Sequence, residues 1–212
     1  MKRFRLLGLL PLGFFLAQAI HYWHINELGQ VFWMCNIGNL LLALGLFLEN
    51  AVMIRMASIW MVPGVAVWVV YVVPTWGTLV TGQASLDQLF GVLSSTLAHL
   101  GGFSVGMLVL RRIRMDGRAW IYGLGWYLVV QLLSRIITPV AMNVNVAHQI
   151  QAGWEQTFSV YWKFWLVLTL LVGICLWVLG SILRLLWPVE RQRQISSEPS
   201  PNTSAKTPNA FD

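Results

Sequence analysis

The sequence predicts an all-α fold, a polytopic integral membrane bundle of six transmembrane helices. Of its 212 residues, 57% are hydrophobic and only 10% are charged, whereas roughly a quarter of the residues in a soluble domain are charged. The 12 tryptophans and the mean hydropathy of +0.66 agree with this class, because a soluble core of this size cannot bury so much apolar surface. The same composition excludes disordered, collagen-like and disulfide-rich proteins.

Six apolar segments are long enough to be membrane spans, since a bilayer core about 30 Å thick needs roughly 20 apolar residues of helix. They cover residues 6–22, 31–48, 56–73, 86–110, 119–142 and 159–186. Together they form one domain, 1–190, and the Ser-, Pro- and Asn-rich segment 191–212 is predicted to be a disordered cytoplasmic tail. Residues 1–19 also fit a cleaved signal peptide, because a basic start and an apolar run precede Ala17-Gln18-Ala19; that alternative stays open.

The basic residues predict the orientation of the chain. Apart from Arg135 and Lys163, all of the 14 Lys and Arg residues fall on one side of the membrane in the six-span topology. Because Lys and Arg in short loops remain cytoplasmic during insertion, both termini are expected in the cytoplasm, most naturally of a bacterial inner membrane. The net charge of +6 is therefore explained by the orientation of the chain in the membrane and not by nucleic-acid binding. The expected partners are membrane lipids.

Local signals mark several helix boundaries and contacts. Ser85 and Gln88 have the spacing of a capping box at the start of the fourth segment. Three prolines, Pro63, Pro74 and Pro139, predict kinks or ends. The motif Gly102-x-x-x-Gly106 predicts a face on which another helix packs closely.

Strongly polar residues inside the spans are the best candidates for function, because they are costly in a bilayer and usually face the bundle interior. The second segment contains Cys35, Asn36 and Asn39, and the fourth contains His99. At about 1.5 Å of rise per residue, Cys35 and His99 lie at nearly the same depth. Further candidates near the outer surface are Arg135, Asn145 and His148. We expect an outward-opening polar cavity among these residues.

The chemistry of these residues supports one hypothesis about an enzyme. Cys35 and His99 are the candidate catalytic residues, a thiolate nucleophile and its general base. Asn36 or Asn39 is the candidate oxyanion donor. Arg135 is suited to a lipid phosphate, and the substrate-binding set is Asn36, Asn39, Arg135, Asn145 and His148. The hypothesis is a lipid acyltransferase or acyl hydrolase that works through an acyl-cysteine.

Two other classes of protein remain open from the residues alone. The polar stripes also fit a non-enzymatic membrane protein, either a small transporter or an assembly factor, in which they are interhelical hydrogen bonds. The spacing of His21, His24 and Glu27, with His148 on the same side, also fits a histidine-ligated metal or haem site. No metal ligand and no cofactor is assigned.

Several short motifs follow one another between Phe32 and His148. They are Cys35-Asn36-Ile37, Trp60 with Pro63-Gly64, Pro74-Thr75-Trp76, Phe90 followed by His99, and Asn143-Val144-Asn145. Their order resembles the YwaF-type six-helix intramembrane protein family, whose animal relatives include an acyltransferase acting on ether phospholipids. The resemblance implies that Cys35 and His99 act together on an acyl chain. The chain departs from the family pattern at Val31-Phe32-Trp33-Met34, where the family has His and Pro residues.

Overall fold

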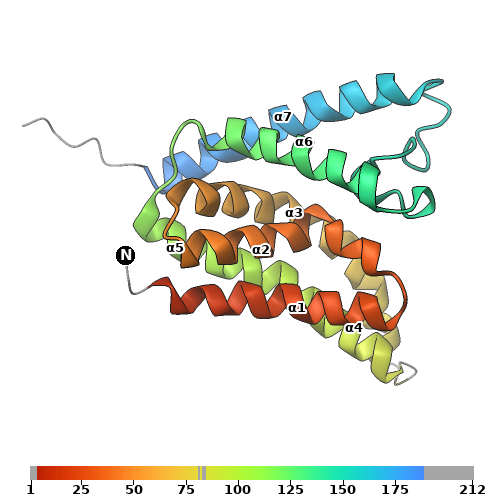
Figure 1. Ribbon diagram of the computed structural model, residues 1–212, viewed down its shortest axis with the longest axis horizontal. Helices are drawn as coiled ribbons and strands as arrows, with labels where there is room; N and C mark the ends of the chain where they lie inside the picture. Colours follow the sequence, from red (N-terminus) through yellow and green to blue (C-terminus); the bar gives the residue numbers. More distant parts are fainter. Residues whose placement is uncertain (1–3, 81, 83–84, 189–212) are drawn as a thin grey trace, which may run out of the picture.

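The computed structural model describes residues 4–80, 82 and 85–188, and the helices among them pack into a bundle (Figure 1). The main helices are α1 (Leu9–His24), α2 (Met34–Phe47), α3 (Ala51–Val80), α4 (Leu86–Thr96), α5 (Gly102–Ile113), α6 (Ala119–Ile137) and α7 (Tyr161–Leu186). Short 3-10 turns lie at Leu6–Gly8, Leu28–Phe32, Val140–Met142 and Val144–Val146. A single π-helical turn, Leu97–Gly101, joins α4 to α5, so that the two form one continuous rod.

Five helical segments of the described chain are long and apolar enough to cross a membrane. They are Leu6–His24, Ala51–Val70, Leu86–Ile113, Ala119–Ile137 and Tyr161–Leu186. The remaining apolar helix, α2, has only 14 residues and is about 21 Å long, which is less than the thickness of a bilayer core. The structure therefore supports a multi-pass helical membrane protein with five long spans and one shorter apolar helix.

Several boundaries differ from those expected from the sequence. Helix α3 continues through Pro63 and Pro74 and is much longer than 56–73. Helix α6 ends at Ile137, earlier than expected, because Thr138 precedes Pro139 and has an extended backbone. Helix α2 begins only at Met34, after the separate turn Leu28–Phe32. The capping box at Ser85 and Gln88 is confirmed, with both reciprocal hydrogen bonds present.

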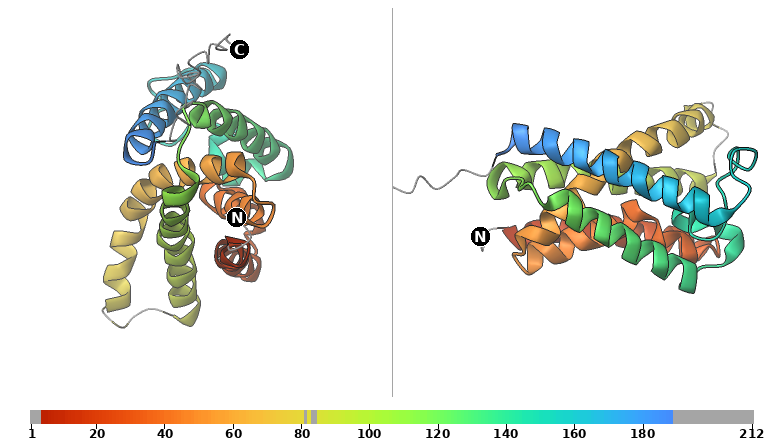
Figure 2. Two further views of the ribbon diagram at one scale, coloured as in Figure 1. Left: turned by 90° about the vertical axis from the view of Figure 1, so that its left-hand side faces the viewer. Right: turned by 90° about the horizontal axis from the view of Figure 1, so that it is seen from above.

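Helix α3 lies at the centre of the bundle. The α6–α7 pair packs on one side of it, and α1, α2 and the α4–α5 rod lie on the other (Figures 1 and 2). One core cluster joins α2, α3 and α5 around Leu42, Leu46 and Ile54, and another joins α3, α5, α6 and α7 around Ile59 and Leu176. Large apolar side chains also cover the outside of the helices, as a lipid-facing surface requires.

The predicted close contact at Gly102 and Gly106 is confirmed. A Cβ atom at Gly102 would lie 2.3 Å from Asn39 Oδ1, and one at Gly106 would lie 3.1 Å from Ser58 Oγ. Glycine at Gly102 lets α5 approach α2 more closely than a side chain would allow without a shift, and glycine at Gly106 allows a tight approach to α3. The motif therefore lies at the close contact of α5 with α2 and α3.

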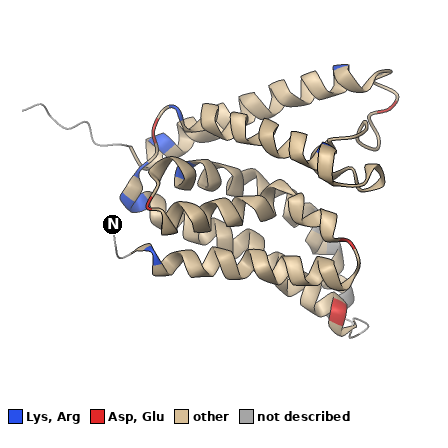
Figure 3. Ribbon diagram, viewed as in Figure 1, with Lys and Arg blue, Asp and Glu red and all other residues tan. Residues whose placement is uncertain are grey.

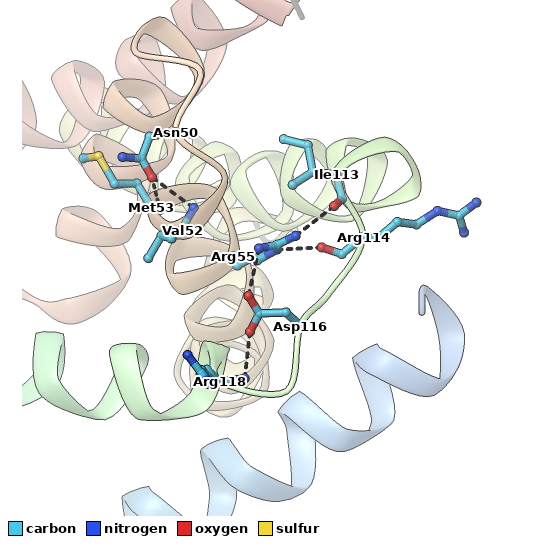
Figure 4. A network of polar contacts seen from close by, with 8 residues as sticks. All are labelled: Asn50, Val52, Met53, Arg55, Ile113, Arg114, Asp116 and Arg118. Atoms are coloured by element: carbon cyan, nitrogen blue, oxygen red, sulfur yellow. Dashed lines mark hydrogen bonds and ion pairs between the residues drawn. The ribbon is translucent and has the colours of Figure 1, made fainter. Parts of the chain in front are cut away.

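Lys and Arg residues gather at the end of the bundle where α5 ends and α6 begins, which we call the basic end (Figure 3). Arg55 of α3 donates to Asp116 Oδ2 at 2.8 Å and to the main-chain oxygens of Ile113 and Arg114 (Figure 4). These bonds hold the loop between α5 and α6 on α3. The amide of Met115 in this loop also donates to the Trp187 carbonyl, so the carboxyl end of α7 lies at the basic end too.

Candidate functional site

Cys35 lies in the first turn of α2, against α3. Its thiol points toward Asn36 Oδ1, with a sulfur–oxygen distance of 4.0 Å. The Asn36 amide nitrogen donates to the Gln30 carbonyl at 3.1 Å, which ties the turn before α2 to its first residues. A Cβ built on Gly64 would lie 3.6 Å from Cys35 Cβ, so Gly64 of α3 lies directly beside Cys35.

The π-helical turn changes the hydrogen bonding of the α4–α5 rod beside α2. Such turns disrupt the regular ladder and are frequent at functional sites. Here the Ala98 carbonyl accepts a hydrogen bond of 2.8 Å from Asn39 Nδ2, which also donates to the Cys35 carbonyl at 3.0 Å. Both amide hydrogens of Asn39 are thereby directed to main-chain oxygens, and the residue bridges the α2 turn of Cys35 and the turn that carries His99.

His99 lies in the π-helical turn and stacks on an aromatic side chain of α3. Its ring is 5.5 Å from that of Trp68, at an interplanar angle of 16°. His99 Nδ1 lies 2.8 Å from the Ser95 carbonyl oxygen, and Trp68 Nε1 donates to Ser95 Oγ at 3.0 Å. Because a carbonyl oxygen only accepts, the contact assigns a proton to Nδ1, so that Nε2 is the basic nitrogen when the ring is neutral.

A pocket of about 240 Å³ opens between α1, α3 and α4. Its lining residues are Gln18, His21, Tyr22, Trp68, Val72, Thr75, Gly91, Val92 and Ser95. Among these lining residues, Tyr22 lies beside Asn36 and near Cys35. Trp68 and Ser95, also in the lining, contact His99. Cys35 and His99 therefore each lie one residue behind the lining of this pocket, and the described contacts do not join the thiol to the imidazole directly.

The other predicted site residues form a separate cluster around the loop after α6. Asn145 Nδ2 donates to the Phe32 carbonyl at 2.7 Å and to Ser134 Oγ at 2.9 Å. Its Oδ1 accepts from the Met34 amide at 3.0 Å. Because the first amides of a helix have no partner within the helix, Asn145 caps α2 from a distant part of the chain.

Arg135 and His148 also bind within this second cluster. Arg135 donates to the Ala147 carbonyl at 2.7 Å, and its guanidinium lies 5.2 Å from the centre of the Tyr161 ring. His148 Nε2 lies 3.3 Å from Thr138 Oγ1. The residues expected to line a single outward cavity thus fall into two groups. Cys35, Asn36, Asn39 and His99 lie near the pocket, and Arg135, Asn145 and His148 hold the loop after α6 on α2, α6 and α7.

The histidines at the end of α1 lie at a second, larger pocket of about 380 Å³ that shares His21 with the first. His24 Nε2 is 3.5 Å from Asp87 Oδ1, and both side chains are largely exposed. Within residues 4–80, 82 and 85–188, no group of three His, Cys, Asp or Glu side chains is placed to hold a metal ion. The ligand set expected from His21, His24, Glu27 and His148 is therefore not assembled among these residues.

Sequence reasoning missed Gln18, Tyr22 and Trp68, which the structure places in the pocket wall. Tyr22 and Trp68 belong to a chain rich in aromatic residues, so their presence carried little information. Gln18 did carry a signal, because a glutamine inside an apolar span is costly unless it has a purpose. In the sequence, Gln18 lies within Ala17-Gln18-Ala19, which also fits a signal-peptide cleavage site, whereas the structure buries it within the bundle.

No protein-family model, curated protein or solved structure matches this chain.

Proposed function

We propose that the protein is an intramembrane acyl-transfer enzyme, a lipid acyltransferase or acyl hydrolase, with Cys35 as nucleophile and His99 as general base. The observation that carries the proposal is the pocket between α1, α3 and α4, because its lining residues contact both the surroundings of Cys35 and His99. An acyl chain already lies in the bilayer, so a lipid substrate needs only to present its ester at this pocket.

The proposed reaction has two steps. In the first, the Cys35 sulfur attacks the ester carbonyl, the proton of the thiol passes to His99 Nε2, and the alcohol leaves with that proton as the carbon–oxygen bond breaks. In the second, a hydroxyl group of water or of another lipid attacks the thioester, and Cys35 regains its proton. Both hydrogens of the Asn39 amide are directed to main-chain oxygens, whereas the Asn36 amide nitrogen makes one such bond, to the Gln30 carbonyl. Asn36 is therefore the better candidate for an oxyanion donor.

We also propose that the protein resides in a bacterial inner membrane, with α2 as a sixth crossing and with the basic end and both termini in the cytoplasm. The segregation of Lys and Arg to one end of the bundle supports this orientation (Figure 3). Membrane lipids are then the partners and substrates. The second cluster would lie near the outer surface, where Arg135 is suited to a lipid phosphate.

The proposal is tested by labelling native membranes with an alkyne-tagged long-chain acyl thioester probe. We expect wild-type protein to become labelled, and neutral hydroxylamine to release the label, as it does for thioesters. Cys35→Ala is expected to abolish labelling, and His99→Ala is expected to slow it by 10²- to 10⁴-fold, about the contribution of a general base. The matched control is Cys175→Ala, which removes the exposed cysteine of α7 and is expected to label normally.

Labelling that persists in Cys35→Ala, or that disappears only in Cys175→Ala, would contradict the proposal. Equal expression and equal size-exclusion profiles for the variants would show that folding is not the cause of any loss.

A second candidate function, a non-enzymatic small transporter or assembly factor, is favoured by the amide groups of Asn39 and Asn145, which serve intrachain hydrogen bonds. It predicts no labelling of the wild type and no effect of Cys35→Ser.

A further inference from the structure

The second pocket lies between the carboxyl end of α1 and the amino end of α4, at the end of the bundle opposite the basic end (Figures 1 and 3). Its six lining residues are Ile20, His21, Trp23, His24, Asp87 and Phe90. The His21 ring packs on α4, since a Cβ at Gly91 would lie 2.7 Å from that ring and the centre of the Phe90 ring lies 6.0 Å from its centre. The volume of about 380 Å³ falls within the range of ligand sites, about 300–1,000 Å³.

Asp87 gives this pocket a negative charge that a ligand can reach, because 67% of its side chain is exposed. Its ion-pair partner in the described part of the chain is His24, at 3.5 Å, which is itself 69% exposed and is charged only when protonated. None of the six lining residues is Lys or Arg. Arg55, the one Lys or Arg between residues 6 and 110, is bound to Asp116 at the basic end. Because exposed pairs are weak, a cationic ligand can take the place of His24.

Two aromatic rings in the lining fit an organic cation. Trp23 is 71% exposed and Phe90 is 43% exposed, so both rings are accessible from the pocket. A cation within about 6 Å of such a ring is attracted to its face, and ammonium groups are commonly recognised in this way. A metal ion fits less well, because the described residues place no group of three His, Cys, Asp or Glu side chains to hold one. The ligand class is therefore an ammonium group with carbon substituents.

The level of the pocket along the helices indicates that this ligand is an amphiphile. His24 is the last residue of the candidate span Leu6–His24, and Asp87 is the second residue of the candidate span Leu86–Ile113. Both charged groups therefore lie where the helices leave the apolar core, which is the level of lipid head groups. Ile20 lies about 6 Å deeper along α1 and is 54% exposed. An apolar chain attached to the ammonium group can run along this side of α1.

We propose that the second pocket binds the ammonium group of a membrane amphiphile. Asp87 is the counter-ion, the rings of Trp23 and Phe90 contact the carbon substituents of the nitrogen, and the apolar chain lies along Ile20. The inference goes beyond the proposed function, because it involves no chemistry at Cys35. A bound amphiphile lies next to the pocket of the proposed reaction, since His21 lines both pockets.

The test is a competition experiment on the full chain in dodecyl maltoside micelles, which supply no ammonium group. The protein is photo-crosslinked with a trace of a diazirine-bearing analogue of dodecyltrimethylammonium. Unlabelled dodecyltrimethylammonium then competes, in comparison with dodecyldimethylphosphine oxide, which keeps the chain and a tetrahedral head group and has no net charge. Both competitors are dosed by their mole fraction in the micelle, so that a difference in partitioning does not affect the comparison.

We expect dodecyltrimethylammonium to compete at a roughly tenfold lower mole fraction than the phosphine oxide, because the ion pair and the ring contacts act together. Asp87→Asn removes the charge and keeps the size of the side chain, and it is expected to reduce this preference to about twofold, the part that the rings contribute. The matched control is Glu155→Gln. It removes a carboxylate from the α6–α7 loop, outside the lining of the pocket, and is expected to keep the tenfold preference.

Equal competition by the two compounds on wild-type protein would overturn the inference, and this comparison needs no variant to fold. A tenfold preference that survives in Asp87→Asn would overturn the assignment to this pocket. Tetramethylammonium that competes at the same total concentration as dodecyltrimethylammonium would overturn the assignment to an amphiphile. Cys35→Ala is expected to keep the preference, so this competition and the acyl-labelling experiment can fail independently.

Discussion

Gly102 and Asn39 face each other across the contact between α5 and α2. Because two hydrogen bonds hold the Asn39 amide, the side chain cannot turn away from a new Cβ atom 2.3 Å from its Oδ1 without losing them. We expect Gly102→Ala to lower the free energy of unfolding by about 1–3 kcal/mol, the usual cost of overpacking. The measurement is unfolding in detergent micelles by titration with dodecyl sulfate.

The matched control at this scale is Gly125→Ala. It lies in α6, where an added Cβ would meet no atom within 4 Å. Alanine favours a helix over glycine by about 1 kcal/mol, so this variant is expected to be as stable as the wild type or slightly more stable. If both variants behave alike, then Asn39 moves freely and does not bridge Cys35 and the π-helical turn as described.

At the scale of elements, Arg55 fastens the α5–α6 loop to α3 (Figure 4). Its side chain is only 15% exposed, and three acceptors would lose their charged donor in Arg55→Met. Hydrogen bonds to charged groups are worth about 1.5–3 kcal/mol, and we expect a loss of unfolding free energy in that range. The same titration with dodecyl sulfate measures it.

Arg5→Met provides the comparison for Arg55. Arg5 also makes an ion pair at 2.8 Å, with Glu49, but 59% of its side chain is exposed. Exposed pairs contribute about 0–1 kcal/mol, so this variant is expected to change stability little. An equal effect of the two substitutions would mean that the loop is held by its apolar contacts, such as those of the buried Met115, rather than by Arg55.

At the scale of the whole molecule, the α5–α6 loop and the α6–α7 loop lie at opposite ends of the bundle (Figure 1). The proposed orientation places the first loop in the cytoplasm. We therefore expect a membrane-impermeant maleimide to label Gln156→Cys in intact cells, and to label Arg118→Cys only after the cells are permeabilised. Both positions are exposed. The reverse pattern would invert the proposed orientation.

The sequence by itself determined the fold class and much of the local structure. Apolar length predicts membrane helices because a bilayer core cannot solvate the peptide backbone. The capping box at Ser85 and the close-packing glycines at Gly102 and Gly106 were predictable because they depend on residues three or four apart in one helix. Cys35 and His99 were also identifiable as costly polar groups, whereas their surroundings were not.

Only the tertiary structure decided which polar atoms meet. The bond from Asn39 to the Ala98 carbonyl joins residues 59 apart, and the bond from the Met34 amide to Asn145 joins residues 111 apart. Helical periodicity shows which side chains share a face, but not which helix packs on that face or at what level. For the same reason Gln18, an ordinary break in an apolar run, became visible as a buried acceptor only once α1, α3 and α4 were placed around it.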